Sequence, residues 1–487
     1  MRGSTLTSGL KRGAMYLKHL PMRKLAQFLA NPTGAVIATV LVVAAGSYLY
    51  FNGLGYLTDV LIAFGTAILL AFLYEKPQWC LYLLVFAIPF NGKDIFGPIR
   101  LTEIVTLLTI IVFATRTLRG MQLDVVKPTF LFLVLGAFLL SNTISAFGSI
   151  VPQVSAQRIL VLGYLITLSF LIGQFVTKRE SLEKLVKVLL ISFTTFGVYG
   201  IVQFFSPWYR QVAFANVWNV NGLPRITLFY GDPNLVSGYM VVAILFCLSL
   251  YLNNLYRKSW LLRIALVSMT LSVFLTFSRS GLLALAVGVT FLLAMHLRPT
   301  VVKRTLQLAG TALLVLVLAY NTVKPVQKVL QPAVLRITQI ADTRVESVGA
   351  RFVAYESAIE MVRDHPFFGV GPDVFPYEYD VRTGVTAPEP HVVPHNLLLE
   401  IIAEKGLVGL SLYLAFILTL IYAVRRSLQR LQPDETTTRA VLQWILAWLP
   451  AFFTLTLFLT GMYEVYFWFL TGIVYAISSR LPWQQKS

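Results

Sequence analysis

Apolar runs of membrane-spanning length alternate with short polar turns along most of the chain. A helix needs about 20 apolar residues to cross the hydrocarbon core of a bilayer. Runs of this kind occur at 34–51, 57–74, 101–118, 128–147, 154–176, 185–205, 234–252, 261–277, 281–297, 305–322, 406–424, 440–461 and 464–480. A shorter run at 79–90, with Pro89 near its end, is a further candidate. The pattern predicts an all-α polytopic membrane protein with about fourteen transmembrane helices.

One long polar segment, 323–405, interrupts this pattern. Four apolar side chains share one helical face within residues 351–363: Phe352, Tyr355, Ile359 and Val362. They predict an amphipathic helix that lies on the membrane surface or against the helix bundle. The glycines and prolines of HPFFGVGP end that helix. Asn396 is predicted to cap the helix LLLEIIAEKGLVGL, which carries the chain back into the bilayer.

These patterns divide the chain into four parts. The parts are a basic N-terminal segment (1–33), an N-terminal transmembrane bundle (34–322), a loop domain (323–405), and C-terminal transmembrane helices with a short tail (406–487). The basic segment interleaves lysines and arginines with leucines. It fits either an amphipathic helix on the cytoplasmic leaflet or a disordered basic tail.

Composition excludes a soluble globular class. The 487 residues are 57% hydrophobic and 13% charged, which is too little charge to cover a soluble protein of this length. The net charge of +18 indicates basic cytoplasmic loops rather than a nucleic-acid partner, because no nucleic-acid-binding motif is present. Both cysteines, Cys80 and Cys247, lie in apolar runs, so neither a disulfide framework nor a metal cluster is indicated.

The short basic loops predict the orientation of the chain. Lysines and arginines concentrate in every second turn, which the positive-inside rule assigns to the cytoplasm. These residues are Lys76, Arg116, Arg119, Lys127, Lys178, Arg179, Lys184, Lys187, Arg257, Lys258, Arg298, Lys303, Arg304, Arg425, Arg426 and Arg430. We therefore expect both termini in the cytoplasm and the loop domain outside it.

Several arginines violate this bias by falling on the outer side. They include Arg158, Arg225, Arg279 and Arg351. An arginine at the outer membrane boundary is costly unless it has a partner. Each one could extend its side chain to phospholipid head groups. As a set, they favour an anionic ligand on the outer face, because guanidinium groups bind phosphate oxygens in bidentate fashion.

Histidine is the candidate catalytic residue type. His395 stands next to the predicted helix N-terminus, where the helix dipole lowers its pKa and keeps the imidazole neutral, as a general base requires. A histidine that only caps or packs a loop is the alternative interpretation. His391 is a weaker second candidate, and Glu404 lies nearby in the sequence. The chain contains no HExxH zinc motif and no GxSxG nucleophile motif.

Four segments together carry a resemblance to a known family. They are the arginine followed by GDPN (Arg225–Asn234), the SRSG turn (Ser278–Gly281), the segment from Arg351 to HPFFGVG, and HNLLLEIIAEKGLVGL from His395. In this order and spacing, over roughly residues 225–424, the chain resembles the O-antigen ligase/O-antigen polymerase superfamily of bacterial envelope enzymes.

This resemblance implies a GT-C-like glycosyltransferase at the outer face of the inner membrane. The donor would be a glycan on undecaprenyl diphosphate, without nucleotide sugar, metal or other cofactor. The resemblance assigns the catalytic histidine to His395 and the diphosphate-binding arginines to Arg225 and Arg279. Arg158 matches a third arginine by topology only. We add His391, Asn234, Asn396, Glu404 and Arg351 as candidate supporting residues.

The resemblance leaves the acceptor open. The chain could ligate a glycan to lipid A-core, polymerise repeat units with a chain-length regulator as partner, or glycosylate a protein. A different class, a flippase or transporter of lipid-linked oligosaccharides, fits the number of spans. It would predict charges deep within spans and internal pseudo-symmetry, and neither is evident in the sequence.

Overall fold

The computed structural model describes residues 69–90, 100–118, 129–206, 219–220, 223–228, 230–296, 346–384 and 392–480, with single residues at 66 and between 307 and 331. The predicted basic segment, the runs at 34–51 and 305–322, most of the run at 57–74, and His391 lie outside these residues. The chain forms two compact units. Residues Met1–Leu83 and Val105–Leu123 form the first, and Leu84–Ile104 and Asp124–Ser487 form the second.

Most of the described residues are helical, and the helices coincide with the predicted runs. The helices that match predicted spans are α5 (Gln78–Ala87), continued by η2 (Ile88–Phe90), α6 (Leu101–Leu118), α7 (Phe130–Ala146), α8 (Pro152–Phe175), α9 (Arg179–Phe205), α10 (Pro233–Leu252), α11 (Trp260–Leu275), α12 (Arg279–Met295), α17 (Leu397–Arg430), α18 (Thr436–Thr456) and α19 (Val465–Arg480). Six of the described helices are long and apolar enough to cross a membrane. The prediction of a multi-pass helical membrane protein is therefore confirmed.

Two short strands add to the helices. Strand β1 (Asn219–Val220) pairs antiparallel with β2 (Leu223–Pro224), with Val220 opposite Leu223. The hydrophobic and polar pattern did not predict this hairpin. It lies directly before Arg225, so it leads the chain into the first predicted motif.

Within the second unit, small residues allow close helix packing around α10. Gly288 of α12 leaves room for Leu245 of α10 and for Ala451 of α18. Trp444 of α18 is buried and its Nε1 donates a hydrogen bond of 2.9 Å to the carbonyl of Val242. Between membrane helices, close packing and buried hydrogen bonds replace the hydrophobic driving force that acts in water. Helix α10 is therefore a rigid element, and its N-terminus can position a site.

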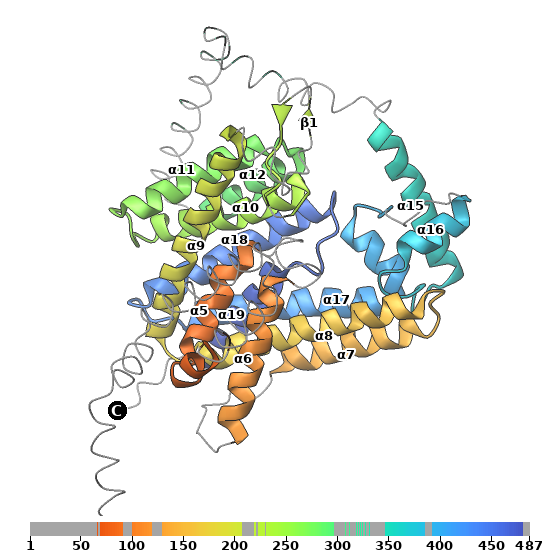
Figure 1. Ribbon diagram of the computed structural model, residues 1–487, viewed down its shortest axis with the longest axis horizontal. Helices are drawn as coiled ribbons and strands as arrows, with labels where there is room; N and C mark the ends of the chain where they lie inside the picture. Colours follow the sequence, from red (N-terminus) through yellow and green to blue (C-terminus); the bar gives the residue numbers. More distant parts are fainter. Residues whose placement is uncertain are drawn as a thin grey trace, which may run out of the picture. The chain divides into compact units, whose positions relative to one another are not determined.

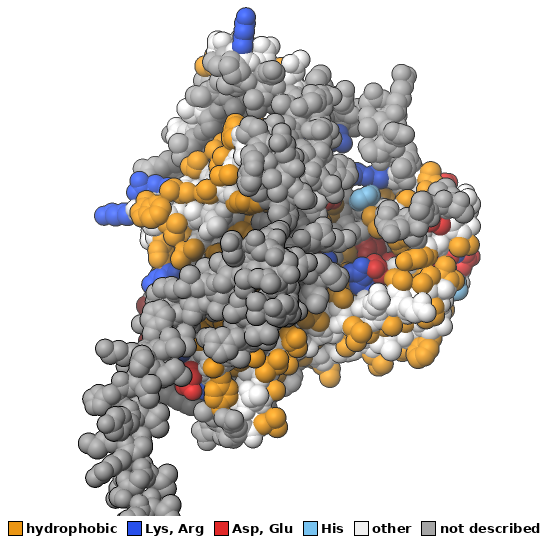
Figure 2. Space-filling view, in the orientation of Figure 1, with side chains coloured by type: hydrophobic (Ala, Val, Ile, Leu, Met, Phe, Trp, Pro, Cys, Tyr) orange, Lys and Arg blue, Asp and Glu red, His pale blue; other side chains and the backbone are white. Residues whose placement is uncertain are grey.

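A second group of helices leads to the loop domain. Helix α7 packs against α8 and α17, and α8 packs against α19. In Figure 1, α7, α8 and α17 run side by side, and α15 (Glu346–Asp364) and α16 (Phe375–Thr383) lie at their ends. Figure 2 shows hydrophobic side chains spread over the visible faces of the helices, with charged side chains gathered near α15–α17.

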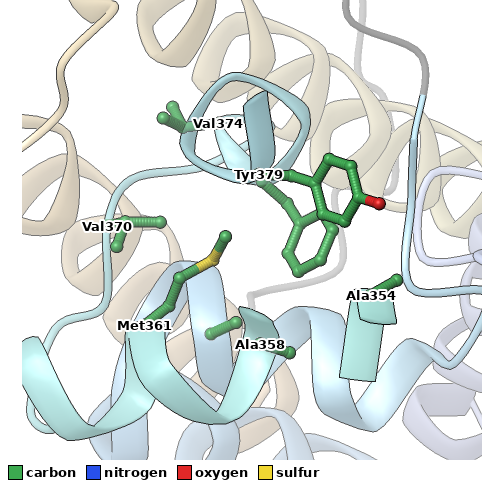
Figure 3. Close-up of a cluster of buried hydrophobic side chains, with 8 residues drawn as sticks. Ala354, Ala358, Met361, Val370, Val374 and Tyr379 are labelled. Atoms are coloured by element: carbon green, nitrogen blue, oxygen red, sulfur yellow. The ribbon is translucent and has the colours of Figure 1, made fainter. Parts of the chain in front are cut away.

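The loop domain has its own small core, shown in Figure 3. Its buried side chains are Ala354, Ala358, Met361, Val370, Val374, Phe375, Tyr379 and Ala403. The predicted amphipathic helix is present as α15, but its packed face is made of the smaller residues. Phe352 is 62% exposed and Ile359 is 46% exposed. The sequence left open whether the large apolar face lies on the membrane surface or against the helix bundle. For Phe352 and Ile359, packing against the bundle is wrong. The small residues of α15 are buried instead, because they let α15 approach α16 and Ala403 closely.

An exchange of backbone hydrogen bonds joins the HPFFGVG segment to α17. In a regular helix, the N–H groups of Leu407 and Val408 would bond to residues 403 and 404. Here they donate to the carbonyls of Pro366 (2.8 Å) and Phe367 (3.1 Å).

The carbonyls that lose these donors find new ones in the same segment. Ala403 accepts from Val370 N–H (3.1 Å), and Glu404 accepts from Gly371 N–H (2.9 Å). No backbone group of this exchange is left unsatisfied, as burial requires. We call this exchange of four hydrogen bonds the backbone clasp.

Two glycines make the clasp sterically feasible. Gly406 has φ 63° and ψ −169° and produces a kink within α17. A Cβ atom on Gly406 would collide with the backbone of Phe367, and one on Gly369 (φ 70°) would collide with the backbone of Glu404. The clasp therefore fixes the direction of Leu397–Lys405, the part of α17 before the kink.

We predict that Gly406→Ala destabilises the protein more than Gly384→Ala. Both glycines have positive φ, but Gly384 (φ 68°) has open space where a Cβ would lie. Each substitution lowers the unfolding free energy by about 1–2 kcal/mol, because alanine is forced into the left-handed region. Gly406→Ala lowers it by roughly a further 1–3 kcal/mol, because the Cβ collides with the backbone of Phe367. Denaturant unfolding in detergent, followed by tryptophan fluorescence, measures both. Equal losses of unfolding free energy would show that the clasp is not tightly packed.

Candidate active site

The N-terminus of α10 is built by the sequence YGDPN. Asp232 caps the helix, because its Oδ1 accepts a 2.7 Å hydrogen bond from Asn234 N–H. Pro233 occupies the first helical position, where its missing N–H costs nothing. Gly231 takes φ 67°, which a side chain would disfavour. GDPN therefore forms the turn that begins α10.

Arg225 joins this turn to the SRSG turn between α11 and α12. Its Nε donates to the carbonyl of Thr276 at 2.7 Å, and its Nη2 donates to Asn234 Oδ1 at 3.4 Å. Ser278 Oγ donates to the same Asn234 oxygen at 2.8 Å. Arg225 is 5% exposed. Two motifs that are distant in sequence therefore form one network, with Asn234 at its centre.

Arg279 has a different environment from Arg225. It is the first residue of α12, and it is exposed. Ser278 caps this helix by accepting a 3.2 Å hydrogen bond from Gly281 N–H. The N-terminus of a helix and an adjacent guanidinium both favour an anion. Of the arginines in the two motifs, Arg279 is the one whose side chain is accessible to a ligand.

His395 stands in a strained turn directly before α17. Its φ of 47° lies in the left-handed region, which is unusual for a residue other than glycine. The next residue, Asn396, caps α17 by accepting a 3.2 Å hydrogen bond from Leu399 N–H, as predicted. Strained backbone of this kind is common where a side chain must be aimed.

The pKa of His395 is lowered, so the imidazole is neutral near pH 7. Burial is the largest cause, and the positive charge of Arg351 on α15 acts in the same direction. The carboxylate of Asp232 opposes both. The direction agrees with the sequence-based prediction, but the cause is burial and Arg351. The dependence on Asp232 also places His395 in the electrostatic environment of the α10 turn.

Arg158 belongs to a second group of contacts, beside a cavity. It forms an ion pair with Asp373, and its guanidinium carbon lies 4.4 Å from the centroid of the Tyr463 ring. The cavity has a volume of about 200 Å³. Its charged lining residues are Arg100, Arg158, Asp373, Glu400, Glu404 and Glu464. Pro394, directly before His395, also lines it.

One wall of the cavity is held by a buried ion pair. Lys405 Nζ lies 2.8 Å from Glu404 Oε2, and the two side chains are 0% and 2% exposed. The other Glu404 oxygen accepts from Phe375 N–H at 3.3 Å. Burying two charges is costly unless they are paired in this way. Glu404 therefore holds the loop domain against α17.

Sequence reasoning thus found part of this site. Asn234 accepts a hydrogen bond from Arg225, Asn396 caps α17, and the charge of Arg351 lowers the pKa of His395, while the functional roles of these residues stay predictions. Asp232, Asp373, Tyr463 and Glu464 had not been selected as site residues. A usable signal existed for the last two, because Tyr463 and Glu464 are polar residues between two strongly apolar runs.

We predict opposite shifts of the His395 pKa in two variants. Arg351→Met removes a repelling charge and raises the pKa, and Asp232→Asn removes an attracting charge and lowers it further. Asparagine also caps helices, so the α10 turn is retained. NMR titration of the imidazole Hε1 resonance, assigned with His395→Gln, measures both shifts. Shifts in the same direction would contradict this electrostatic environment.

The same pKa predicts how stability depends on pH. The unfolded chain takes up the His395 proton near pH 6.5, above the pKa in the folded state. The contribution of His395 to stability is therefore complete above about pH 6.5 and is lost as the pH falls towards the lowered pKa.

Comparison with models of known protein families gives a match. The model of the O-antigen ligase family matches residues 264–414. This range contains the SRSG turn, α15, the backbone clasp and His395, whereas Arg225 and GDPN lie before it; the resemblance had been placed on roughly 225–424. No curated protein matches the chain. The family match thus supports the resemblance of this multi-pass membrane protein to the O-antigen ligase/O-antigen polymerase superfamily.

Proposed function

We propose that the chain is a membrane glycosyltransferase. It transfers a glycan from undecaprenyl diphosphate to an acceptor hydroxyl at the outer face of the bacterial inner membrane. The family match supports a ligase-type glycosyltransferase. The donor, the GT-C-like class, about fourteen spans, cytoplasmic termini and a periplasmic loop domain are parts of our proposal. So are the four parts of the chain, 1–33, 34–322, 323–405 and 406–487.

One observation carries this proposal more than any other. Asp232 caps α10, whose Asn234 bonds to Arg225 and to Ser278, and the same Asp232 influences the charge of His395. A neutral imidazole and a set of arginines thereby belong to one electrostatic environment. A transferase that expels a diphosphate needs both, since it removes a proton from the acceptor and stabilises negative charge on the leaving group.

In the proposed reaction, neutral His395 accepts the proton of the acceptor hydroxyl. The acceptor oxygen forms a bond to the anomeric carbon, and the bond from that carbon to the diphosphate oxygen breaks with inversion. Undecaprenyl diphosphate leaves with the electron pair of the broken bond. Its growing charge is stabilised by cationic groups, which contribute most in a site that excludes water.

The arginines divide the work of binding the diphosphate in this proposal. Arg279 is exposed and supplies the direct contact, with the N-terminus of α12 beside it. Arg225 is buried and holds the two turns together through Thr276 and Asn234. Arg158 is paired with Asp373, so it reaches the diphosphate only after giving up that carboxylate. His391, Asn234, Asn396, Glu404 and Arg351 support this arrangement.

We predict that His395→Ala abolishes transfer while donor binding is retained. The loss of a general base reduces the rate by roughly 10²–10⁴-fold. His365→Ala is the matched control, because His365 is an exposed histidine of the same domain. Purified protein is incubated with a lipid-linked repeat unit, and products are separated by gel electrophoresis. Transfer by His395→Ala at the rate of the unmodified chain would exclude His395 as the base.

The same assay identifies the acceptor. A ladder of longer products from the lipid-linked repeat unit alone would identify a polymerase, with the donor glycan as its own acceptor. Products that form only after lipid A-core is added would identify a ligase, and products that need a protein would identify a protein glycosyltransferase. The absence of product with every acceptor would contradict the proposed function and favour transport of the lipid-linked glycan.

A further inference from the structure

The cavity beside Arg158 contains polar atoms that the described protein does not satisfy. Glu400 lines the cavity and is 7% exposed, and its Oε2 has no hydrogen-bond partner among the described residues. The hydroxyl of Tyr463 lines the same cavity, is buried, and is likewise without a partner in the described part of the chain. A buried polar atom without a partner is costly, so a ligand that supplies a donor is favoured here.

The other carboxylates of the cavity already have partners. Asp373 is paired with Arg158, and Glu404 is paired with Lys405. Glu464 accepts a 3.2 Å hydrogen bond from the hydroxyl of Tyr239. The carboxylate of Glu400 therefore stands out as an acceptor directed at a ligand. Burial and the nearby Glu404 raise the pKa of Glu400 to about 8, and once it is ionised the group binds O–H or N–H donors and repels a second carboxylate.

The size and position of the cavity restrict the ligand further. A volume of about 200 Å³, at about 30 Å³ for each water, equals the space of about seven waters. That is enough space for one sugar ring. Pro394 lines the cavity and His395 is the next residue, so a ring in the cavity lies close to the proposed base.

We propose that this cavity is the acceptor subsite and binds one neutral or amino-substituted pyranose, with Glu400 accepting a hydrogen bond from a ring hydroxyl or from an ammonium group. Tyr463 offers a second polar contact, and Phe375 and Pro394 form the apolar part of the wall. The excess of carboxylates over arginines disfavours acidic sugars. The assignment to the acceptor rests on the proposed function, but the chemistry of the bound ring does not.

Three methyl glycosides test the binding preference directly. They are methyl glucoside, methyl glucosaminide with a free amine, and methyl glucuronoside. Saturation-transfer NMR is recorded on the full chain in detergent with each compound. We expect signals from the neutral and amino sugars and a signal from the glucuronoside at least about tenfold weaker. No signal from any sugar, or equal signals from all three, would overturn the proposal.

Variants at Glu400 identify the anchoring group. Glu400→Leu removes the acceptor and abolishes the signals of the neutral and amino sugars. Glu400→Gln retains an acceptor oxygen, so it keeps the neutral sugar and loses the preference for the amine. Glu356→Gln, an exposed glutamate on α15, is the matched control. Signals unchanged in Glu400→Leu, with an unfolding midpoint equal to that of the control, would overturn the assignment to Glu400.

A kinetic test separates this inference from the proposed function. Once a transfer assay exists, Glu400→Leu should raise the KM for the acceptor by about 10–100-fold and leave the KM for the lipid-linked donor unchanged. Equal effects on both constants would overturn the acceptor assignment. His395→Ala should still bind the methyl glycosides. Sugar binding by a chain that transfers nothing would sink the proposed function alone, and transfer without sugar binding would sink this inference alone.

Discussion

The backbone clasp is the constraint on which the rest of the site depends. It exchanges helical hydrogen bonds at residues 403–408 for bonds to Pro366–Gly371, and it requires glycine at 369 and 406. Because the kink at Gly406 turns the first part of α17, the clasp sets the positions of His395, Glu400 and Glu404 together. It also fastens the loop domain to α17, a helix that is long and apolar enough to cross a membrane. The polar groups of the loop domain are thereby held in a fixed position relative to α17.

The second organising feature is electrostatic. The carboxylate of Asp232 acts on several groups of the candidate site. This carboxylate caps α10, affects the pKa of His395, and repels the carboxylate of Glu464. Glu464 lines the cavity, and His395 follows a residue that lines it. The arginine network at the SRSG turn and the carboxylate-lined cavity are therefore coupled through one side chain. A substitution at Asp232 is expected to affect both.

Local patterns in the sequence predicted the helices and their caps well. Asn396 carries its signal within four residues and begins a helix as predicted, and Asp232–Pro233 and Ser278 begin helices in the same local way. Long-range pairings were not predictable in this way. Nothing in the sequence indicates that Arg158 pairs with Asp373, or that Phe352 and Ile359 are exposed while Ala354 and Ala358 pack. The clasp illustrates this difference. Its backbone hydrogen bonds join segments that are distant in the sequence, and only the glycines at 369 and 406 mark them there.

The proposed donor and acceptor need groups of opposite charge, and Arg279 and Glu400 lie at different places in the fold: Arg279 begins α12, and Glu400 lines the cavity. A diphosphate needs exposed cationic groups, which Arg279 and the N-terminus of α12 provide. A sugar hydroxyl needs acceptors, which Glu400 provides in the cavity. If both sets of groups occupied one pocket, the carboxylates would neutralise the arginines and weaken diphosphate binding. The ion pairs Arg158–Asp373 and Lys405–Glu404 keep the excess charge of the acceptor side low. In the proposed function, the neutral imidazole of His395 suits both groups, because it adds no charge to either until it accepts the proton.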